Sequence, residues 1–505
     1  MVRKIINILA IDIGTQSIRA GIVNSQGTIL AVSQQLQEVD SPFPGWAQQQ
    51  PKIWWDLTKQ VISDVIKKSK VEINSIKAVS TCGQMHGPVG IDKNGNITTE
   101  WTQIWMDKRC ENICNKIREN FDESKLIQIT GNPITTGWPS FKIKWIKENQ
   151  PEIYNKTKWF LVPKDFVNYQ LTGVASTDPS EASGTYLYDY TTNKYSNYMA
   201  EVLDIDLSKF APINNSYDTI GKTQPKISRE IGIPANIAVI AGGGDFMVSL
   251  LGLGLVKEGT AVDMTGTSTL FVVHKDKPII NPSVQNLRHV IDGWIPFTIL
   301  DTGGLSMKWC KDFLSSVNLG EISYEQMIEM AEKISSGSEG LIFYPYLLGE
   351  RKQDNIHAKG CLFGLTLNHK AGHIARSVME GVGLALGRDI QTFKNIGVDI
   401  KQVFCVGGAT RNKLLYQIKA DITQIPHILT DEPEASLRGC GLLAAFGLGF
   451  IKSFEEIVFK ENANCIIIEP DKKKAIEYKA LQLEFNRMYD HLIGYWKGLV
   501  VPNPS

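Results

Sequence analysis

The chain has 505 residues, 43% of them hydrophobic and 21% charged, which is the composition of an ordinary globular protein. One hydrophobic core rarely extends over so many residues, so we expect at least two domains. The 53 basic and 53 acidic side chains cancel, which argues against nucleic acid as a partner of the whole chain.

The spacing of the cysteines and the length of the apolar segments indicate in which cellular compartment the protein resides. Eight cysteines are scattered along the chain, and the only close pair, Cys110 and Cys114, has no second pair or histidines at zinc-site spacing. We therefore expect free thiols. No signal-like opening or bilayer-length apolar run is present, so the sequence predicts a cytoplasmic protein without a membrane partner.

The first half opens with short apolar strands separated by turns, followed by a helix and another strand. This mixture predicts an α/β fold. The expected strands are residues 8–13, 19–24, 28–34 and 76–80, and the expected helix is 51–68.

The second half starts in a similar way, with apolar strands beside Gly-Asp and Gly-Thr pairs. An internal duplication is the economical interpretation, with the halves meeting near residues 245–258 and packing directly on one another. In this interpretation the second set of strands begins at residue 238. The expected elements are strands at 238–244, 260–264, 269–274 and 402–406, and helices at 374–393, 412–421 and 471–497.

Three glycine turns have the pattern of phosphate-binding loops. Residues 12–17 (Asp-Ile-Gly-Thr-Gln-Ser) and 263–268 (Asp-Met-Thr-Gly-Thr-Ser) each follow a strand, and such turns aim backbone N–H groups at an anion. The carboxylate of Asp12 can hold a magnesium-bound water. A third turn, residues 407–409, lies between a strand and a helix. Alone, the turn at residues 12–17 is more typical of a plain hairpin and the turn at 407–409 of a tight strand-to-helix connection, but the three together favour nucleotide binding.

Residues 241–246 (Ala-Gly-Gly-Gly-Asp-Phe) give the sharpest single signal for catalysis. Three glycines remove neighbouring side chains and leave one carboxylate, Asp245, facing whatever approaches. Phosphoryl transfer to an alcohol needs a group that positions the hydroxyl and accepts its proton, and one Asp with magnesium meets that need. A structural Asp that caps the following helix is an equally good interpretation of this segment alone.

Two further polar clusters, residues 84–87 and 105–109, suggest a sugar site. Sugar hydroxyls need paired donors and acceptors beside an apolar face. Singly, His86 is more typical of a loop histidine, and Asp107 with Arg109 of a surface ion pair. The polar candidates are Gln84, His86, Asp107 and Arg109, and the apolar ones are Met85, Trp105 and Trp138.

At this point the sequence resembles the FGGY family of carbohydrate kinases. Two family signatures carry the resemblance, one at residues 137–149 and one at 360–380, and the similarity extends from Ile8 to about Leu448. It implies two actin-like, ribonuclease H-like α/β domains related by duplication, with an interdomain cleft. Residues 1–247 would bind mainly the sugar, and residues 248–505 mainly ATP.

Within the family the nearest resemblance is to the xylulokinases, through residues 83–87, 162–165, 181–185 and 349–351. It implies ATP-dependent phosphorylation of a small sugar, a ketopentose such as D-xylulose. Sedoheptulose kinases share the Gln-Met-His-Gly loop, so ribulose, sedoheptulose and an autoinducer-type pentanedione remain alternatives. The oligomeric state stays open, a homodimer being one alternative.

The resemblance also implies roles for single residues. Asp245 would be the catalytic base, and Asp12 would hold Mg²⁺ through water. The implied substrate-binding residues are Gln84, Met85, His86, Trp105, Asp107, Arg109, Asp245 and Phe246. The implied ATP-binding residues are Gly14, Thr15, Gln16, Thr265, Gly266, Thr267, Gly408, Ala409 and Asn412.

Two departures from the xylulokinase pattern concern the sugar, and two rival functions remain. Phe246 stands where xylulokinases have Asn, and residues 105–109 are Trp-Met-Asp-Lys-Arg where xylulokinases have Trp-Asn-Asp-Gly-Arg. The fold also serves ATPases and chaperones that hydrolyse ATP with water and need no sugar pocket. The Gln-Met-His-Gly loop and the two signatures argue against that rival, and intact Asp245 argues against a silent sugar sensor.

Overall fold

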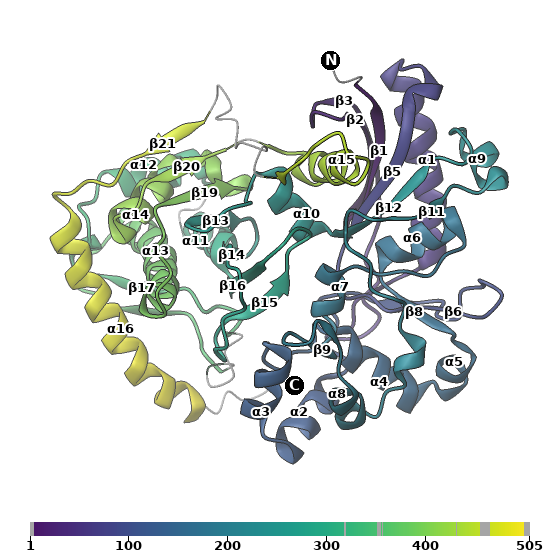
Figure 1. The fold of residues 1–505 in the computed structure, drawn as a ribbon. Helices are drawn as coiled ribbons and strands as arrows, with labels where there is room; N and C mark the ends of the chain where they lie inside the picture. Colours follow the sequence, from purple (N-terminus) through teal and green to yellow (C-terminus); the bar gives the residue numbers. More distant parts are fainter. Residues whose placement is uncertain are drawn as a thin grey trace. The chain divides into compact units, whose positions relative to one another are not determined.

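The computed structural model describes residues 5–317, 320–350, 355, 357–430, 432–454 and 465–498 (Figure 1). The chain divides into two compact units, which we describe separately. Unit 1 comprises residues 1–256, 275–296 and 434–459, and unit 2 comprises residues 257–274, 297–433 and 460–505. Within the described ranges, no helix has the length and apolar character needed to cross a membrane.

Unit 1 is built on a sheet with the strand order β11-β12-β5-β1-β2-β3. Strand β1 pairs antiparallel with β2, and β2 antiparallel with β3, while β5 and β12 run parallel to β1. The strands of this unit are β1 (Asn7–Ile13), β2 (Ser17–Asn24), β3 (Ile29–Leu36), β4 (Gln48–Gln49), β5 (Ile76–Gly83), β6 (Val89–Ile91), β7 (Thr102–Gln103), β8 (Trp159–Leu161), β9 (Tyr188–Asp189), β10 (Lys194–Tyr195), β11 (Thr219–Lys222), β12 (Ala238–Gly244) and β15 (Gln285–Arg288).

Some helices of unit 1 cover this sheet, and others form a separate helical region beside it. Helix α1 starts at a proline, which suits a helical N1 position, and ends at Lys70 in the left-handed conformation. The helices are α1 (Pro51–Ser69), α2 (Glu111–Asn120), α3 (Glu123–Thr130), α4 (Pro139–Asn149), α5 (Pro151–Lys156), α6 (Pro163–Thr172), α7 (Pro179–Ser183), α8 (Asn197–Leu203), α9 (Pro225–Ile231), α10 (Asp245–Gly252) and α15 (Ala435–Gly447).

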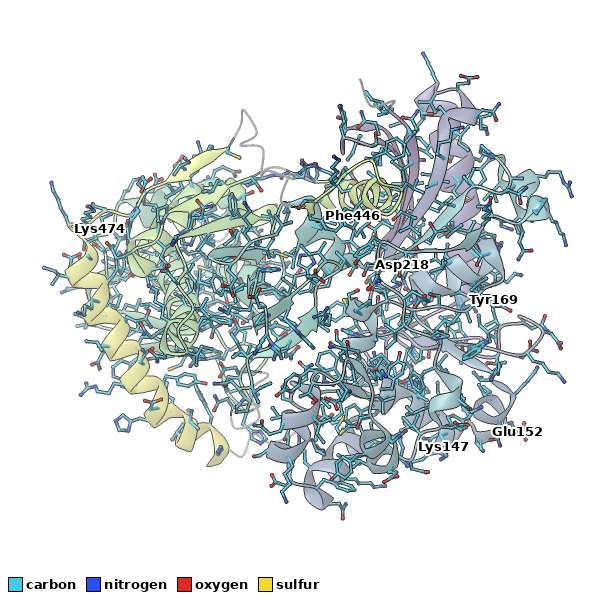
Figure 2. The ribbon with its side chains drawn as sticks, viewed as in Figure 1. Lys147, Glu152, Tyr169, Asp218, Phe446 and Lys474 are labelled. Atoms are coloured by element: carbon cyan, nitrogen blue, oxygen red, sulfur yellow. The ribbon has the colours of Figure 1, made fainter. Side chains whose placement is uncertain are left out.

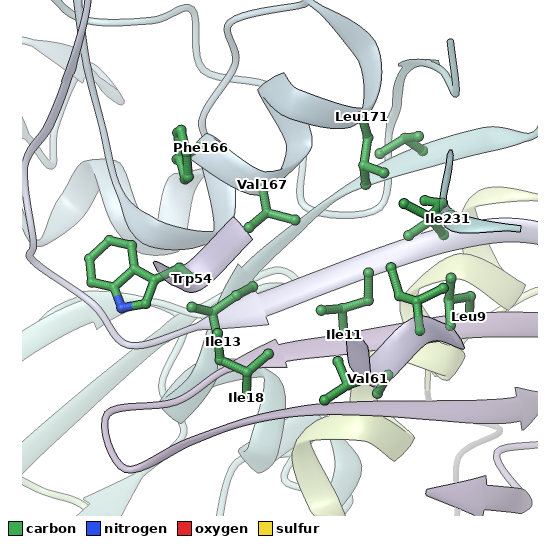
Figure 3. Packing of buried hydrophobic residues seen from close by; sticks show 14 of the residues in the cluster. Leu9, Ile11, Ile13, Ile18, Trp54, Val61, Phe166, Val167, Leu171 and Ile231 are labelled. Atoms are coloured by element: carbon green, nitrogen blue, oxygen red, sulfur yellow. The ribbon is translucent and has the colours of Figure 1, made fainter. Parts of the chain in front are cut away.

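The main core of unit 1 lies between one face of the sheet and the helices α1, α6 and α9 (Figure 3). Ile11 and Ile13 of β1 meet Trp54 and Val61 of α1, and Val167 of α6 belongs to the same cluster. Every second residue of β1 and β2 faces this core, while most of the residues between them are also buried, and the buried residues of α1 recur at helical spacing. This packing fixes the ends of β1, β5 and β12, which carry the candidate active-site residues.

Helix α15 comes from near the end of the chain but belongs to unit 1. Phe446, labelled in Figure 2, stacks on Phe454 with ring centroids 4.0 Å apart and meets Tyr217 edge-on at 4.9 Å. Gly252 and Gly439 allow α10 and α15 to approach closely, because a Cβ on Gly252 would lie 1.9 Å from the Ala435 carbonyl oxygen. This packing brings the N-terminus of α15, with Ser436, to the sheet of unit 1.

Unit 2 repeats the same strand plan. Its strands belong to a seven-stranded sheet with the order β15-β16-β14-β13-β19-β20-β21, in which neighbours among β13, β14 and β16 run antiparallel and β19 and β20 run parallel to β13. The strands are β13 (Thr260–Thr265), β14 (Thr269–Val273), β16 (Trp294–Leu300), β17 (Ile342–Tyr344), β18 (Cys361–Phe363), β19 (Gln402–Val406), β20 (His427–Leu429) and β21 (Ile466–Ile468). The helices are α11 (Gly303–Val317), α12 (Tyr324–Glu332), α13 (Ala371–Asn395), α14 (Lys413–Thr423) and α16 (Ala475–Gly498).

The shared plan confirms the predicted mixed α/β fold with an internal duplication. One detail of the prediction is wrong: residues 238–244 do not open the second set of strands. They form β12, which pairs parallel with β5 and completes the sheet of unit 1, and the second sheet begins with β13. Arg351, part of one sequence motif, lies outside the described residues.

Candidate active site

Asp12 lies at the end of β1 and is held by an arginine of the neighbouring strand. Asp12 and Arg19 are cross-strand partners in the antiparallel register, so their side chains share one face of the sheet. Arg19 donates to Oδ2 of Asp12 and also pairs with Glu434, and Ser436 Oγ donates to the same Oδ2 at 2.7 Å. Oδ1 of Asp12 is buried and has no hydrogen-bond partner among the described residues.

Asp245 begins helix α10 directly after strand β12. Its Oδ1 accepts a hydrogen bond from the backbone N–H of Phe246 at 2.7 Å. Burial and the negative charge of Asp12 raise the pKa of Asp245 to about 7, although that hydrogen bond and Arg19 act in the opposite direction. A carboxyl group with a pKa near neutrality is suited to accept a proton and release it again.

The glycines before Asp245 are required by close approaches. Gly242 has a φ of +70° and lies so near β5 that a Cβ would sit 1.8 Å from the Thr81 carbonyl oxygen. A Cβ on Gly243 would meet Val290 at 2.2 Å, and one on Gly244 would meet Met85 Sδ at 2.6 Å. The glycine run therefore lets β12 reach the Gln-Met-His-Gly loop.

That loop presents an uncharged histidine. His86 has a φ of +72°, and its ring meets Trp138 edge-on with centroids 5.1 Å apart. Burial and the nearby Lys142 lower the pKa of His86 to about 3, so the imidazole is neutral. Lys142, which is fully buried, donates to the carbonyl oxygens of His86 and Gly137, each at 3.0 Å.

A chain of hydrogen bonds joins the glycine turn after β1 to the predicted sugar loops. Trp105 Nε1 donates to Thr15 Oγ1 at 3.1 Å, and that hydroxyl donates to Gln84 Oε1 at 3.1 Å. Gln84 Nε2 donates to Gln49 Oε1 at 2.7 Å, and Gln49 Nε2 donates back to the Thr15 carbonyl oxygen at 2.8 Å. Trp105 remains 38% exposed, so its ring is available as an apolar surface.

Asp107 and Arg109 form a buried ion pair whose polar atoms have protein partners. Arg109 Nη2 lies 2.7 Å from Asp107 Oδ2 and donates to Gln48 Oε1 at 2.8 Å. The same Asp107 oxygen accepts the backbone N–H of Ala47, and the guanidinium lies 3.6 Å from the ring centroid of Trp46. The pair fixes the loop that carries Trp105.

In unit 2, two predicted nucleotide turns lie next to each other. A Cβ on Gly407 would lie 2.5 Å from the Thr265 carbonyl oxygen, whereas a Cβ on Gly266 or Gly408 would meet open space. Thr265 Oγ1 donates to Asp263 Oδ1 at 2.6 Å. Thr267 is exposed, Ala409 is half-buried, and Asn412 caps α14 by accepting the Leu415 N–H at 3.0 Å.

A buried cluster in unit 2 contains three residues of the types that bind metals, but a lysine already pairs with its carboxylate. Potential ligand atoms of Asp263, Cys405 and His427 lie within 4.8 Å of one another. Lys419 Nζ is 2.6 Å from Asp263 Oδ2, and both side chains are fully buried. The ammonium group already neutralises this carboxylate, so we do not interpret the group as a metal centre.

Sequence reasoning missed three parts of this arrangement. The first part is Arg19, which counting outward from a four-residue hairpin turn at residues 14–17 places opposite Asp12. No local signal brings Ser436 to Asp12, because 424 residues separate them. The third part is the start of α11 in unit 2, where a Cβ on Gly304 would lie 1.8 Å from the Gly266 carbonyl oxygen. The Thr-Gly-Gly sequence of residues 302–304, at the start of that helix, was an available signal.

Comparisons with known proteins agree with this geometry. Residues 7–252 match the N-terminal domain of the FGGY family of carbohydrate kinases, and residues 262–448 match its C-terminal domain. The chain is 28% identical to the xylulose kinase of Bacillus subtilis strain 168, over 96% of this chain and 97% of the relative.

Solved structures show the same fold. The xylulose kinase of Rhodospirillum rubrum superposes with a TM-score of 0.91 at 24% identity, over 98% of this chain and 100% of that one. Plasmodium falciparum glycerol kinase, solved with ADP, superposes with a TM-score of 0.86 at 21% identity, over 96% and 98% of the two chains.

The two repeated α/β units and the family matches define a sugar kinase with two actin-like domains. The chain belongs to the FGGY family of carbohydrate kinases. Its reaction class, phosphorylation of a sugar at the expense of ATP, follows from that membership. This confirms the predicted fold class and enzyme class.

Proposed function

We propose that this kinase phosphorylates a ketose, with D-xylulose as the first candidate, and that Asp245 is its catalytic base. The place of Asp245 at the start of α10, directly after the glycines of β12, is the observation that carries the base assignment, and its raised pKa agrees with that role. The B. subtilis relative, named a xylulose kinase, supports the choice of sugar. Ribulose, sedoheptulose and an autoinducer-type pentanedione are the other candidates.

Asp245 would accept the proton of the attacking sugar hydroxyl. The hydroxyl oxygen bonds to the γ-phosphorus, the bond from that phosphorus to the β,γ-bridging oxygen breaks, and ADP leaves. Asp12 and Arg19 would set the charge around this step, since Asp12 helps to raise the pKa of the base. Closure of such kinases excludes water that would otherwise compete as acceptor.

Mg²⁺ is the metal that we propose for this site. The unpartnered, buried Oδ1 of Asp12 is a hard oxygen donor of the kind that Mg²⁺ prefers, so the residues fit a water-mediated magnesium ion. When bound, the ion would neutralise phosphate charge. Asp12, already fixed by Arg19 and Ser436, would hold it.

The proposed contacts with the sugar come from the loops and the helix α10 of unit 1, and the proposed contacts with the nucleotide come from the glycine turns of both units. Met85, His86 and Trp105 would contact the sugar with their neutral or apolar surfaces, and Gln84 and the buried Asp107–Arg109 pair would position those loops. Phe246 would face the sugar from the first turn of α10. The proposed nucleotide contacts are Gly14, Thr15 and Gln16 in unit 1 and Thr265, Gly266, Thr267, Gly408, Ala409 and Asn412 in unit 2.

A coupled ADP-release screen across ketoses, aldoses, polyols and sugar acids tests the proposed function. We expect release that depends on sugar and is largest with a ketose. The xylulose proposal fails if another class of sugar is turned over best. Release without sugar at a comparable rate would favour the actin-like ATPase instead.

Substitution of the base is the matching test of the residue assignment. We expect Asp245→Asn to fold and to bind MgATP but to lose sugar-dependent turnover by about 10²- to 10⁴-fold, the usual contribution of a general base. Steady-state kinetics with titration calorimetry for ATP measure both properties. Near-normal turnover by a folded Asp245→Asn would remove the assignment.

A further inference from the structure

The end of strand β12 is held by a buried polar cluster that the proposed chemistry does not use. We call Lys164, Asn168, Asp178, Ser180 and Ser216 the anchor cluster. All five are essentially inaccessible to solvent. Lys164 and Asn168 come from α6, Ser180 belongs to α7, and Asp178 is the N-cap residue of α7.

One hydroxyl links this cluster to the residue before Asp245. Ser180 Oγ accepts the backbone N–H of Gly244 at 3.0 Å and donates to Asp178 Oδ2 at 2.6 Å. A carboxylate acceptor strengthens such a hydroxyl bridge because the second partner is charged. Ser216 Oγ donates to the same Asp178 oxygen at 2.7 Å.

The carboxamide of Asn168 and the ammonium group of Lys164 hold the start of this segment, at Ala241. Asn168 Nδ2 donates to the Ala241 carbonyl oxygen at 2.9 Å, and Lys164 Nζ donates to it at 3.2 Å. Lys164 also lies 3.0 Å from Asp178 Oδ1, so one ion pair connects both attachment points. The segment from Ala241 to Gly244 is therefore fixed through its backbone at each end.

Stability alone gives a weak reason for this arrangement. Buried ion pairs often contribute no more than well-packed apolar residues would, because desolvation offsets their attraction. Glu181, buried beside the cluster, has no hydrogen-bond partner for either carboxylate oxygen among the described residues, and burial raises its pKa. Residues 242–244, by contrast, have no side chains through which packing could hold them, so backbone hydrogen bonds must set their position.

We infer that Ser180 and Asn168 are positioning residues that orient Asp245 by fixing the backbone of residues 241–244. This inference rests on the proposed role of Asp245 as the base. Misplacement of a reacting group by about 1 Å can cost on the order of 100-fold in rate, so the loss of one such bond should appear in kcat.

The test compares Ser180→Ala and Asn168→Ala with Ser176→Ala as a matched control. Ser176 is also a buried serine of unit 1, but its hydroxyl bonds to the Thr177 carbonyl oxygen and to Asn214 and does not contact β12. We expect each test variant to lower kcat by about 10- to 100-fold while KM for ATP changes less than about twofold. The control should keep wild-type kinetics.

A double variant separates a positioning role from a general one. If Ser180 acts through Asp245, adding Ser180→Ala to Asp245→Asn should lower the residual turnover no further. Additive losses would overturn the inference, as would wild-type kcat in both single variants. If Asp245→Asn itself keeps near-normal turnover, the proposed role of Asp245 fails instead, so the two failures are distinguishable.

Folding is checked by circular dichroism and thermal unfolding of each variant. If Ser180→Ala does not fold, Asn168→Ala alone decides, since it removes an attachment on the opposite end of the segment. Failure of both variants to fold would overturn the inference, because the cluster would then serve the fold.

Discussion

Asp245 has a pKa raised to about 7, and this value determines how turnover should depend on pH. The base works only when deprotonated, so kcat/KM should rise about tenfold per pH unit below 7 and level off above it. The charged and titratable groups around Asp245 are Asp12, Arg19, Cys82 and Glu181. Among them, Asp12 is the main neighbour that raises the pKa.

We therefore predict that Asp12→Asn moves the acid limb of the pH profile to lower pH, because a negative neighbour of Asp245 is removed and Arg19 loses one of its two carboxylate partners. Maximal turnover should fall at the same time. Full pH profiles of kcat/KM measure both effects. Glu434→Gln is the control, since it removes the other carboxylate paired with Arg19 and leaves Asp12 in place. An unmoved limb in Asp12→Asn would contradict the prediction.

Phe246 offers a second prediction at the residue scale. An amide at this position would give a sugar hydroxyl a partner, and an unpaired buried hydroxyl costs about 1–3 kcal/mol, roughly ten- to hundredfold in efficiency. Phe246→Asn should raise kcat/KM on D-xylulose within that range. The backbone N–H that bonds Asp245 is retained.

Phe246→Leu is the matched control, because it removes the ring and adds no amide. A comparable gain in both variants would assign the effect to space rather than to hydrogen bonding. If the wild type already turns over xylulose best and Phe246→Asn lowers that rate, position 246 does not determine the sugar.

At the scale of elements, the glycine turns of unit 2 give a test of nucleotide binding. A Cβ on Gly266 meets open space, so Gly266→Val should fold while its side chain occupies the space that a phosphate would need. We expect at least about a tenfold weaker Kd for ATP by titration calorimetry, with sugar binding unchanged. Gly494→Val, at an open position on α16, is the control. Unaltered ATP affinity in Gly266→Val would contradict the assignment.

The same substitution is less informative at Gly14. A Cβ there would lie 2.9 Å from the Ser17 carbonyl oxygen, so Gly14→Val would also strain the hairpin. Weakened ATP binding in this variant is expected but has two causes. Gly14 and Gly266 lie in similar sequence patterns, but only at Gly266 can a side chain be added without a clash with the protein.

Elements with strong periodicity were predictable from the sequence, and their partners were not. The hairpin of β1 and β2 and the helix α1 follow from local patterns. The sequence pattern predicts the wrong sheet for residues 238–244, because the pairing of β12 with β5 spans about 160 residues and leaves no local signal. Likewise, the sequence places Asp107 beside Arg109 but does not show that Trp46 and Gln48 cover the pair.

On the scale of the whole molecule, duplication explains why each unit has an acidic residue in its first strand, whereas the cation beside it comes from a different element, β2 in unit 1 and α14 in unit 2. Asp12 pairs with Arg19 in unit 1, and Asp263 pairs with Lys419 in unit 2. The units have diverged in use. Asp12 keeps a free carboxylate oxygen for a ligand, whereas both oxygens of Asp263 are bonded, to Lys419 and Thr265. The metal proposal therefore belongs to unit 1 alone.

The raised pKa of Asp245 also has a consequence for the stability of the molecule. In the unfolded chain an Asp has a pKa of about 3.9, so the folded state holds this proton more tightly. Its contribution to the free energy of unfolding is present below pH 4, is lost progressively between about pH 4 and 7, and stays lost above pH 7. Asp245→Asn should therefore have a higher thermal midpoint than the wild type at pH 8 and little or no advantage at pH 4. At pH 8 the free energies of unfolding of the two proteins should differ by about 1–4 kcal/mol, as expected when the pKa of a half-buried Asp is raised from about 4 to about 7. Thermal unfolding of both proteins across this pH range measures it, and a stability difference that does not change with pH would show that burial of the charge at Asp245 carries no cost.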